Sequence, residues 1–138
     1  MKAHATVTWF GGKQFVGTDS SKHSMVMSSQ DEENGTGMRP LDVLLVALAG
    51  CTGMGVSDIL IRKRLDLQDL VLNITGEQDD DPPRAFNSIH VEYVLTGIDI
   101  PEKAVQDAID LSLGKYCSVS ATVEGKAEIT TSYKIINR

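Results

Sequence analysis

Two cysteines carry the most reactive side chains of this 138-residue chain. Cys51 lies in the aliphatic stretch LDVLLVALAGCTGMGVSDIL, and Cys117 follows 66 residues later in KYCSVSATV. A thiolate can act as a nucleophile, a metal ligand or one half of a disulfide, whereas a buried thiol is usually a small hydrophobic residue. The function therefore depends on whether the fold brings the two sulfurs together, and the spacing alone leaves that open.

The cysteine spacing argues against two common thiol chemistries. The two residues are too far apart for a CxxC redox pair, and the three scattered histidines (His4, His23 and His90) make a poor metal site. The first ten residues show no export signal, and two cysteines in such a chain indicate a reducing compartment where both thiols stay free. We expect a cytoplasmic protein without a metal or a cofactor.

Composition predicts one soluble domain over residues 1–138. The apolar content is 41%, the mean hydropathy is −0.09 and the formal net charge is −6. An acidic chain is a poor match for nucleic acid or an anionic membrane surface, because binding to phosphate needs clustered Lys and Arg. The uncharged run from Val43 to Ser57 has 15 residues, fewer than the roughly 20 that span a bilayer, so we expect a buried helix there.

Hydrophobic periodicity predicts an α+β fold with mainly antiparallel sheets and a long central buried helix. Alternating residues indicate strands, and Pro, Gly and charged ends indicate the limits of helices. The expected strands are 2–9, 14–18, HSMVMSS, 69–77, 86–95 and 127–136; the expected helices are 40–64, 99–114 and a short one in KYCSVSATV.

The long helix has no solvated face, because nearly every residue from Val43 to Val56 is apolar or small. Gly50, Gly53 and Gly55 each cost about 1 kcal/mol of helix propensity, and the close approach of a second copy of the helix would offset this cost. We therefore predict a homodimer. The helical face that holds Cys51 also holds Leu44, Leu48 and Met54, which predicts an apolar pocket with Asp58 at its edge.

The segments RPLDVLLVALAGCTG and KYCSVSATV, in this order of strands and helices, resemble the OsmC/Ohr family of thiol-dependent hydroperoxide reductases, and its small OsmC-like branch in particular. The resemblance covers about Ala3 to Ile135. It implies an intertwined OsmC-like homodimer in which Cys51 is the peroxidatic thiol and Cys117 the resolving thiol. It also implies a dithiol reductant, of the lipoyl type in the Ohr-type relatives.

The chain departs from the family pattern at two charged positions. Better-studied members carry an arginine in the early strands and a glutamate ten residues before the first cysteine; here Leu41 holds the second position, and the first arginine is Arg39. We identify Arg39 and Asp42 as candidates for this charged pair. The alternative is a solvated helix start, in which a carboxylate faces the helix dipole, and Lys13 is then a turn residue.

The leading hypothesis is a cytoplasmic peroxidase that reduces organic hydroperoxides through a Cys51 sulfenic acid and a Cys51–Cys117 disulfide, in defence against oxidative stress. The pocket residues Leu44, Leu48 and Met54 favour apolar substrates. The main alternative is a non-catalytic dimer that binds a small apolar ligand or senses redox state. A thiol-disulfide exchange protein is a further alternative, which the absence of a CxxC motif disfavours.

Overall fold

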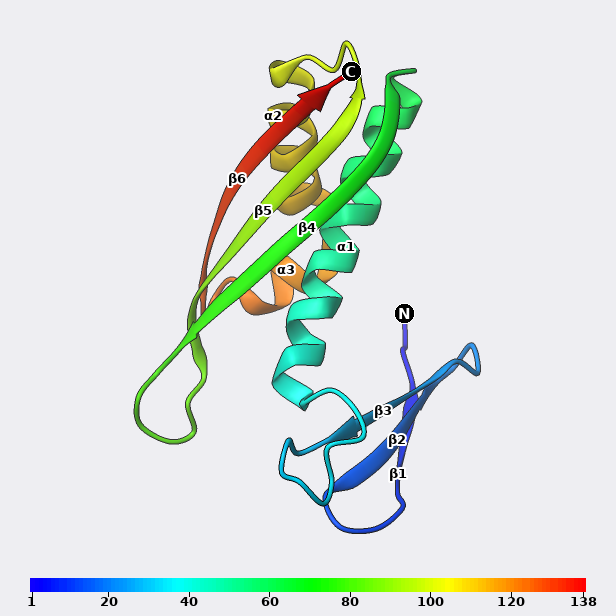
Figure 1. The fold of residues 1–138 in the computed structure, drawn as a ribbon, viewed down its shortest axis with the longest axis vertical. Helices are drawn as coiled ribbons and strands as arrows, with labels where there is room; N and C mark the ends of the chain where they lie inside the picture. The colour runs from blue at the N-terminus through cyan, green and yellow to red at the C-terminus, as the bar shows by residue number, and fades with distance from the viewer. The chain divides into compact units, whose positions relative to one another are not determined.

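The computed structural model describes the whole chain, Met1–Arg138, and divides it into two units, Met1–Leu44 and Leu45–Arg138. The prediction of one domain over residues 1–138 stays a prediction. In chain order (Figure 1), the elements are β1 (Ala5–Trp9), β2 (Gln14–Asp19), β3 (Ser24–Ser28), α1 (Pro40–Arg62), β4 (Asp66–Gln78), β5 (Phe86–Ile98), α2 (Glu102–Leu111), the π-helix η1 (Ser112–Tyr116), α3 (Ser118–Val123) and β6 (Glu128–Asn137).

The N-terminal unit is the expected meander of three antiparallel strands, β1-β2-β3. Gly11 and Gly12 form the first turn with positive φ angles, which side chains other than glycine rarely adopt. The indole nitrogen of Trp9 donates a 2.7 Å hydrogen bond to the Gly12 carbonyl and closes this turn. The alternation of apolar and polar residues along these short segments was therefore sufficient to predict the strands of this sheet.

The C-terminal unit contains a second sheet in the order β4-β5-β6. The predicted hairpin of β4 and β5 is antiparallel, but β6 pairs parallel to β5, with Tyr133 beside Tyr93. The connection between β5 and β6 runs through α2, η1 and α3, and such a crossover returns the chain to the end of the sheet where β5 began. The fold is α+β, with this one parallel pair among antiparallel strands.

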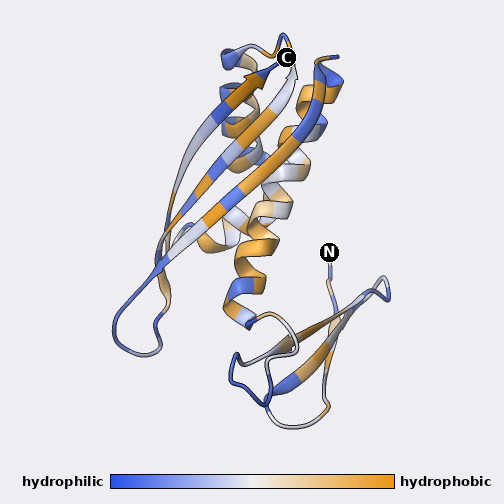
Figure 2. Ribbon diagram, in the orientation of Figure 1, coloured by the Kyte–Doolittle hydropathy of each residue, from blue (hydrophilic) through white to orange (hydrophobic).

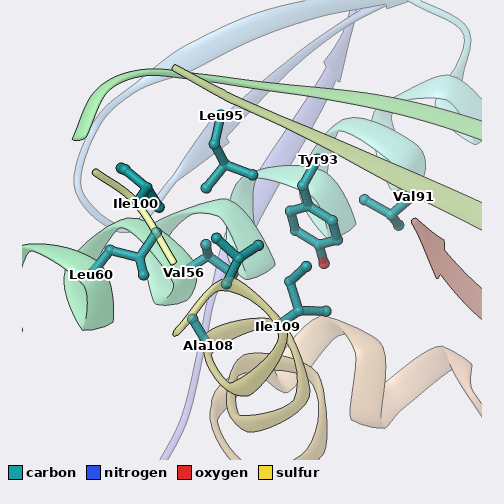
Figure 3. Close-up of a cluster of buried hydrophobic side chains, with 9 residues drawn as sticks. Val56, Leu60, Val91, Tyr93, Leu95, Ile100, Ala108 and Ile109 are labelled. Atoms are coloured by element: carbon teal, nitrogen blue, oxygen red, sulfur yellow. The ribbon is translucent and has the colours of Figure 1, made fainter. Parts of the chain in front are cut away.

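Helices α1 and α2 cover one face of the C-terminal sheet (Figure 1). The inward residues of β5 alternate as the strand period requires and are fully buried, as are their partners on the two helices. Figure 3 shows the resulting core, whose members include Val56, Leu60, Val91, Tyr93, Leu95, Ala108 and Ile109. This packing fixes the orientation of α1 around Cys51, because the buried side of the helix is set by these contacts.

Helix α1 ends at Arg62, two residues earlier than the expected helix. Arg64 adopts a left-handed conformation with φ of 59°, and its amide bonds to the Ile61 carbonyl. The amide of Leu65 bonds to the Leu60 carbonyl five residues back. These two bonds form a Schellman motif, which usually has glycine at the left-handed position, so the basic side chains at the end of this run did not reveal where the helix stops.

One stripe of α1 is exposed in the single chain; the expected all-round cover includes a second copy of the helix, which stays a prediction. The stripe consists of Val46, Gly50, Met54 and Ile61, which recur at intervals of one or two helical turns, and Met54 is 75% exposed. In Figure 2 the middle of α1 is orange and white, without a hydrophilic face. The helix is long and apolar enough to cross a membrane by length and composition. Its opposite side is buried in the protein core, however, as in a core helix.

Candidate functional site

Cys51 lies near the middle of α1, where it is partly buried. Its neighbour in the chain, Thr52, is fully buried, so the backbone at this point is held by the core. The helix therefore places the thiol at the border between the packed interior and the solvent-exposed stripe.

Cys117 lies at the end of the connection from β5 to β6, between η1 and α3. It is the N-cap residue of α3, and its sulfur accepts a hydrogen bond from the Ser120 amide at 3.3 Å. Its own amide donates to the Ser112 carbonyl at 2.7 Å. The thiol is 3% exposed, so the end of the π-helix and the start of α3 hold it in the interior.

The fold brings the two sulfurs together. Cys117 donates a hydrogen bond from its thiol to the sulfur of Cys51, and the backbone amides of Ser118 and Val119 donate to the same sulfur. The first turn of α3 thus directs unpaired N–H groups at Cys51, as helix starts do toward anions. The Cys51 sulfur lies in a cradle of three donors.

This cradle favours the thiolate form of Cys51. Burial raises the pKa of a thiol, but the hydrogen bonds from the Val119 amide, the Cys117 thiol and the Ser118 amide together outweigh burial and lower the pKa of Cys51 below its usual value. Neutral donors, without a cation, therefore lower the pKa of Cys51. The sequence alone does not show this, because two of the three donors are backbone amides 67 and 68 positions away.

Cys117 has the opposite shift. Burial and the hydrogen bond to Cys51 raise its pKa above the ordinary value, in spite of the opposing bonds from Ser120. The thiol form of Cys117 is therefore favoured, although this residue lies at the start of a helix. The amides of Ser118 and Val119 act on Cys51 instead, and the Lys115 ammonium lies over the ring of Tyr116, 5.4 Å from its centroid.

A cavity of about 680 Å³ opens beside Cys51. The residues that line it are mostly apolar at the Cys51 end and charged at the other: Cys51, Met54, Gly55, Asp58, Ile59, Arg62, Leu111 and Tyr116. The two charged residues pair with each other, with 2.9 Å between the Arg62 Nε and an Asp58 oxygen. The cavity is large enough for a small organic molecule.

The predicted pocket residues take different places. Met54 and Asp58 line this cavity together with Cys51. Leu48 is fully buried in the core and Leu44 is half-buried, and the cavity lining includes neither of them. The residues that sequence reasoning missed are Leu111 and Tyr116, because the connection after α2 brings them to α1 from a distant part of the chain.

Arg39 and Asp42 pair with each other at the start of α1. The Arg39 Nε donates to an Asp42 oxygen at 2.9 Å, and both side chains are more than 40% exposed. The carboxylate holds the guanidinium by two hydrogen bonds. No charged side chain contributes to the pKa shift of Cys51.

Gly55 explains how α1 and η1 approach each other. A Cβ atom added at Gly55 would lie 2.5 Å from the Ser112 Oγ, a distance that real contacts do not show. A Cβ at Gly53 would meet Leu72, and one at Gly50 would meet nothing within 4 Å. The close approach at Gly55, which we expected from a second copy of the helix, is therefore made by η1 of the same chain.

The arrangement provides a nucleophile, a second thiol in contact with it, and a largely apolar cavity beside the first thiol. Such a site can carry out two-electron thiol chemistry in which the first sulfur is oxidised and the second forms a disulfide with it. The structure contains no group of three or more His, Cys, Asp or Glu side chains that could hold a metal.

Comparison with known proteins gives the same fold and the same family. Protein YhfA of Escherichia coli strain K12 is 34% identical over 132 residues, 96% of this chain and 97% of that protein. The crystal structure of an OsmC-like protein from Mycoplasma pneumoniae covers 99% of both chains with a TM-score of 0.85 at 17% identity. The organic hydroperoxide resistance protein OhrB of Bacillus subtilis covers 97% of this chain and 98% of its own, with a TM-score of 0.63 at 16% identity.

The family match covers both cysteines. The family described as OsmC-like protein matches residues 32–132, which include α1, η1 and α3. Together with the full-length similarity to YhfA, this establishes the relationship from sequence as well as from fold. The chain belongs to the OsmC-like protein family.

Proposed function

We propose that this protein is a cysteine-based peroxidase that reduces organic hydroperoxides in defence against oxidative stress. The observation that carries the proposal is the hydrogen bond from the Cys117 thiol to Cys51, beside an apolar cavity. The relatives named organic hydroperoxide resistance proteins share the fold and support the choice of reaction.

In the first step the Cys51 thiolate attacks the distal oxygen of the hydroperoxide. The O–O bond breaks, the sulfur is oxidised to a sulfenic acid, and the leaving alkoxide takes a proton to become an alcohol. The lowered pKa of Cys51 supports this role, because the thiolate is the reactive form. Met54, Leu111 and Tyr116 favour an apolar alkyl group in the cavity.

In the second step Cys117 attacks the Cys51 sulfenic acid, which forms the disulfide and releases water. Burial and the contact with Cys51 hold the pKa of Cys117 high while Cys51 is reduced. Oxidation of Cys51 removes the negative sulfur that Cys117 bonds to, and with it the second of these two causes. This change supports Cys117 as the thiol that reacts second.

A dithiol completes the cycle by reducing the disulfide through a mixed disulfide, and a lipoyl-type dithiol is our candidate, by analogy with the Ohr-type relatives. We further propose that the protein is a cytoplasmic homodimer. The exposed apolar stripe of Val46, Gly50, Met54 and Ile61 supports the dimer, because apolar residues that recur on one helix face are usually covered.

Arg39 and Asp42 are retained as proposed site residues, and Met54 as a proposed pocket residue. The support for Arg39 and Asp42 comes from the resemblance and from the ion pair, in which a carboxylate orients the guanidinium. Twelve residues separate Arg39 from Cys51, about 18 Å along the helix axis within one chain, so we assign Arg39 to the site of the second copy in the proposed dimer, where it stabilises charge during the peroxide step with Asp42 as its positioning partner.

The test is a steady-state assay with an alkyl hydroperoxide and dihydrolipoamide. We expect the wild type to consume peroxide and Cys51→Ser to lose this activity completely, while Cys117→Ser turns over more slowly, because the external dithiol must then attack the sulfenic acid itself. Activity that persists in Cys51→Ser would contradict the proposal. A monothiol such as glutathione in place of dihydrolipoamide tests the requirement for a dithiol.

The second candidate is a dimer that binds a small apolar ligand or senses redox state without turnover. The absence of a charged group against Cys51 favours it, because known activated thiols usually have a cation beside them. The two candidates differ in the Cys51 pKa: a value at or above about 8.5, the value for a free thiol, would favour binding or sensing.

A further inference from the structure

Three hydroxyl groups lie together in the apolar core, next to the backbone segments that carry the two cysteines. The Thr52 Oγ1 is 2.7 Å from the Tyr93 hydroxyl oxygen and 3.0 Å from the Ser112 Oγ. All three residues are at most 1% exposed. Figure 3 shows Tyr93 with its hydroxyl directed away from β5, toward the helices.

The hydrogen bonds of this cluster run in one direction. The Ser112 hydroxyl donates to the Thr52 carbonyl at 3.0 Å, so the Thr52 hydroxyl must donate to Ser112 and the Tyr93 hydroxyl must donate to Thr52. Burial, opposed by the Thr52 bond and aided by the nearby Cys117, raises the pKa of Tyr93 to about 12. Tyr93 therefore stays protonated, and a donor, at neutral pH.

The cluster joins the backbone segments that carry the two cysteines. Thr52 is the residue after Cys51, and the Ser112 carbonyl accepts the amide of Cys117 at 2.7 Å. Gly55 makes the contact possible, because any side chain there would displace Ser112. Valine at position 52, phenylalanine at 93 and alanine at 112 would fill the same space without burying a polar side-chain group. Packing alone therefore does not require the three hydroxyls.

We propose that Thr52, Tyr93 and Ser112 are positioning residues that hold Cys51 and Cys117 in the geometry from which the disulfide closes. This inference rests on the proposed function, which supplies the disulfide. Directional hydrogen bonds fix the relative placement of α1 and η1 more narrowly than apolar packing does, and small displacements of reacting atoms cost large factors in rate.

The experiment separates disulfide closure from the reaction with peroxide. Reduced protein is mixed with one equivalent of alkyl hydroperoxide, quenched in acid at set times, and analysed by mass for sulfenic acid and disulfide. The variants are Thr52→Val and Tyr93→Phe, which keep the shape and lose the hydroxyl. The matched controls are Thr52→Ser, which keeps the hydroxyl, and Tyr133→Phe, a half-buried tyrosine on β6.

We expect Thr52→Val and Tyr93→Phe to slow closure by about tenfold or more, with the peroxide step within about twofold of the wild type. Sulfenic acid should accumulate in these two variants and not in Thr52→Ser or Tyr133→Phe. Closure rates within twofold of the wild type in both variants would overturn the proposal. If Thr52→Val does not fold, Tyr93→Phe and Ser112→Ala decide, because each removes a single oxygen atom.

A parallel measurement with oxidised glutathione keeps this test independent of peroxide chemistry. The Cys51 thiolate displaces glutathione thiolate to form a mixed disulfide, and Cys117 then closes the ring and releases the second glutathione. The same tenfold slowing of closure is expected in the two variants. A wild type that closes with glutathione and ignores peroxide would end the proposed function and leave the positioning role standing.

Discussion

Cys117 donates a hydrogen bond from its thiol to the sulfur of Cys51, although 66 positions separate the two residues in the sequence. The contact lies between the middle of α1 and the start of α3, and backbone amides from α3 complete it. One sulfur is thereby favoured as a thiolate and the other as a thiol.

This difference predicts a two-step titration. The pKa of Cys51 is lowered, so its thiolate persists to lower pH than that of a free cysteine, while the pKa of Cys117 is raised. The ultraviolet thiolate absorbance should therefore rise in two steps, one below and one above the pKa of an ordinary cysteine. The rate with peroxide should fall as the pH drops through the lower step, because protonation of Cys51 removes the nucleophile. A single titration step above the pKa of a free cysteine would contradict the three hydrogen bonds to the Cys51 sulfur.

A pair of variants isolates the contribution of the Cys117 thiol. Serine at position 117 keeps a donor for Cys51, whereas alanine removes it. We expect the pKa of Cys51 to be higher in Cys117→Ala than in Cys117→Ser, measured by the pH dependence of alkylation. Equal values would show that the amides of Ser118 and Val119 alone hold the thiolate.

Gly55 is predicted to be intolerant of any side chain. A Cβ atom would clash with Ser112, so Gly55→Ala should lower the free energy of unfolding by about 1–3 kcal/mol in urea denaturation, as overpacking does. Gly114→Ala is the matched control, because a Cβ there meets nothing within 4 Å. Equal stabilities of the two variants would mean that α1 and η1 do not pack as described.

The secondary structure could be largely predicted from the sequence, because it depends on local periodicity. The Pro40 start of α1, the hairpin of β4 and β5, and the short helix after Cys117 follow from apolar spacing and breaker residues. The end of α1 could not be predicted, since Arg64 takes a left-handed conformation that its residue type does not indicate.

The site could be predicted in part. Cys51 and Cys117 stand out by residue type, but two of the three hydrogen bonds that lower the pKa of Cys51 come from backbone amides, which no side-chain pattern reveals. The hydroxyl cluster was missed for a related reason: Thr52 and Ser112 are ordinary helix residues until the crossover brings them together. The resemblance to the OsmC/Ohr family supplied the pairing of the two cysteines, which the spacing had left open.

Arg39 is predicted to assist the peroxide step. Arg39→Ala should slow the reaction of Cys51 with alkyl hydroperoxide by about tenfold, which corresponds to the loss of about 1.4 kcal/mol of charge stabilisation. Closure of the disulfide with oxidised glutathione should be unchanged. Lys103→Ala is the control, because it also removes one cation from an exposed ion pair, here with Asp107. Equal rates for the two variants would reduce Arg39 and Asp42 to a solvated helix start.

The homodimer is tested at Gly50, which lies on the exposed stripe of α1 and has open space around it in the single chain. Light scattering of the wild type should give about 30 kDa, twice the 15.0 kDa of one chain. Gly50→Trp should shift the mass toward the monomer. Glu102→Trp, an exposed position at the start of α2, should not. A monomeric wild type at micromolar concentration would contradict the proposed dimer.

The most direct test of the central claim is a peptide mass map of the reduced protein after one equivalent of alkyl hydroperoxide. The proposed chemistry predicts the loss of both thiols and a new cross-linked peptide pair that contains Cys51 and Cys117. Unchanged thiols, or oxidation of Cys51 beyond sulfenic acid with Cys117 still reduced, would contradict it.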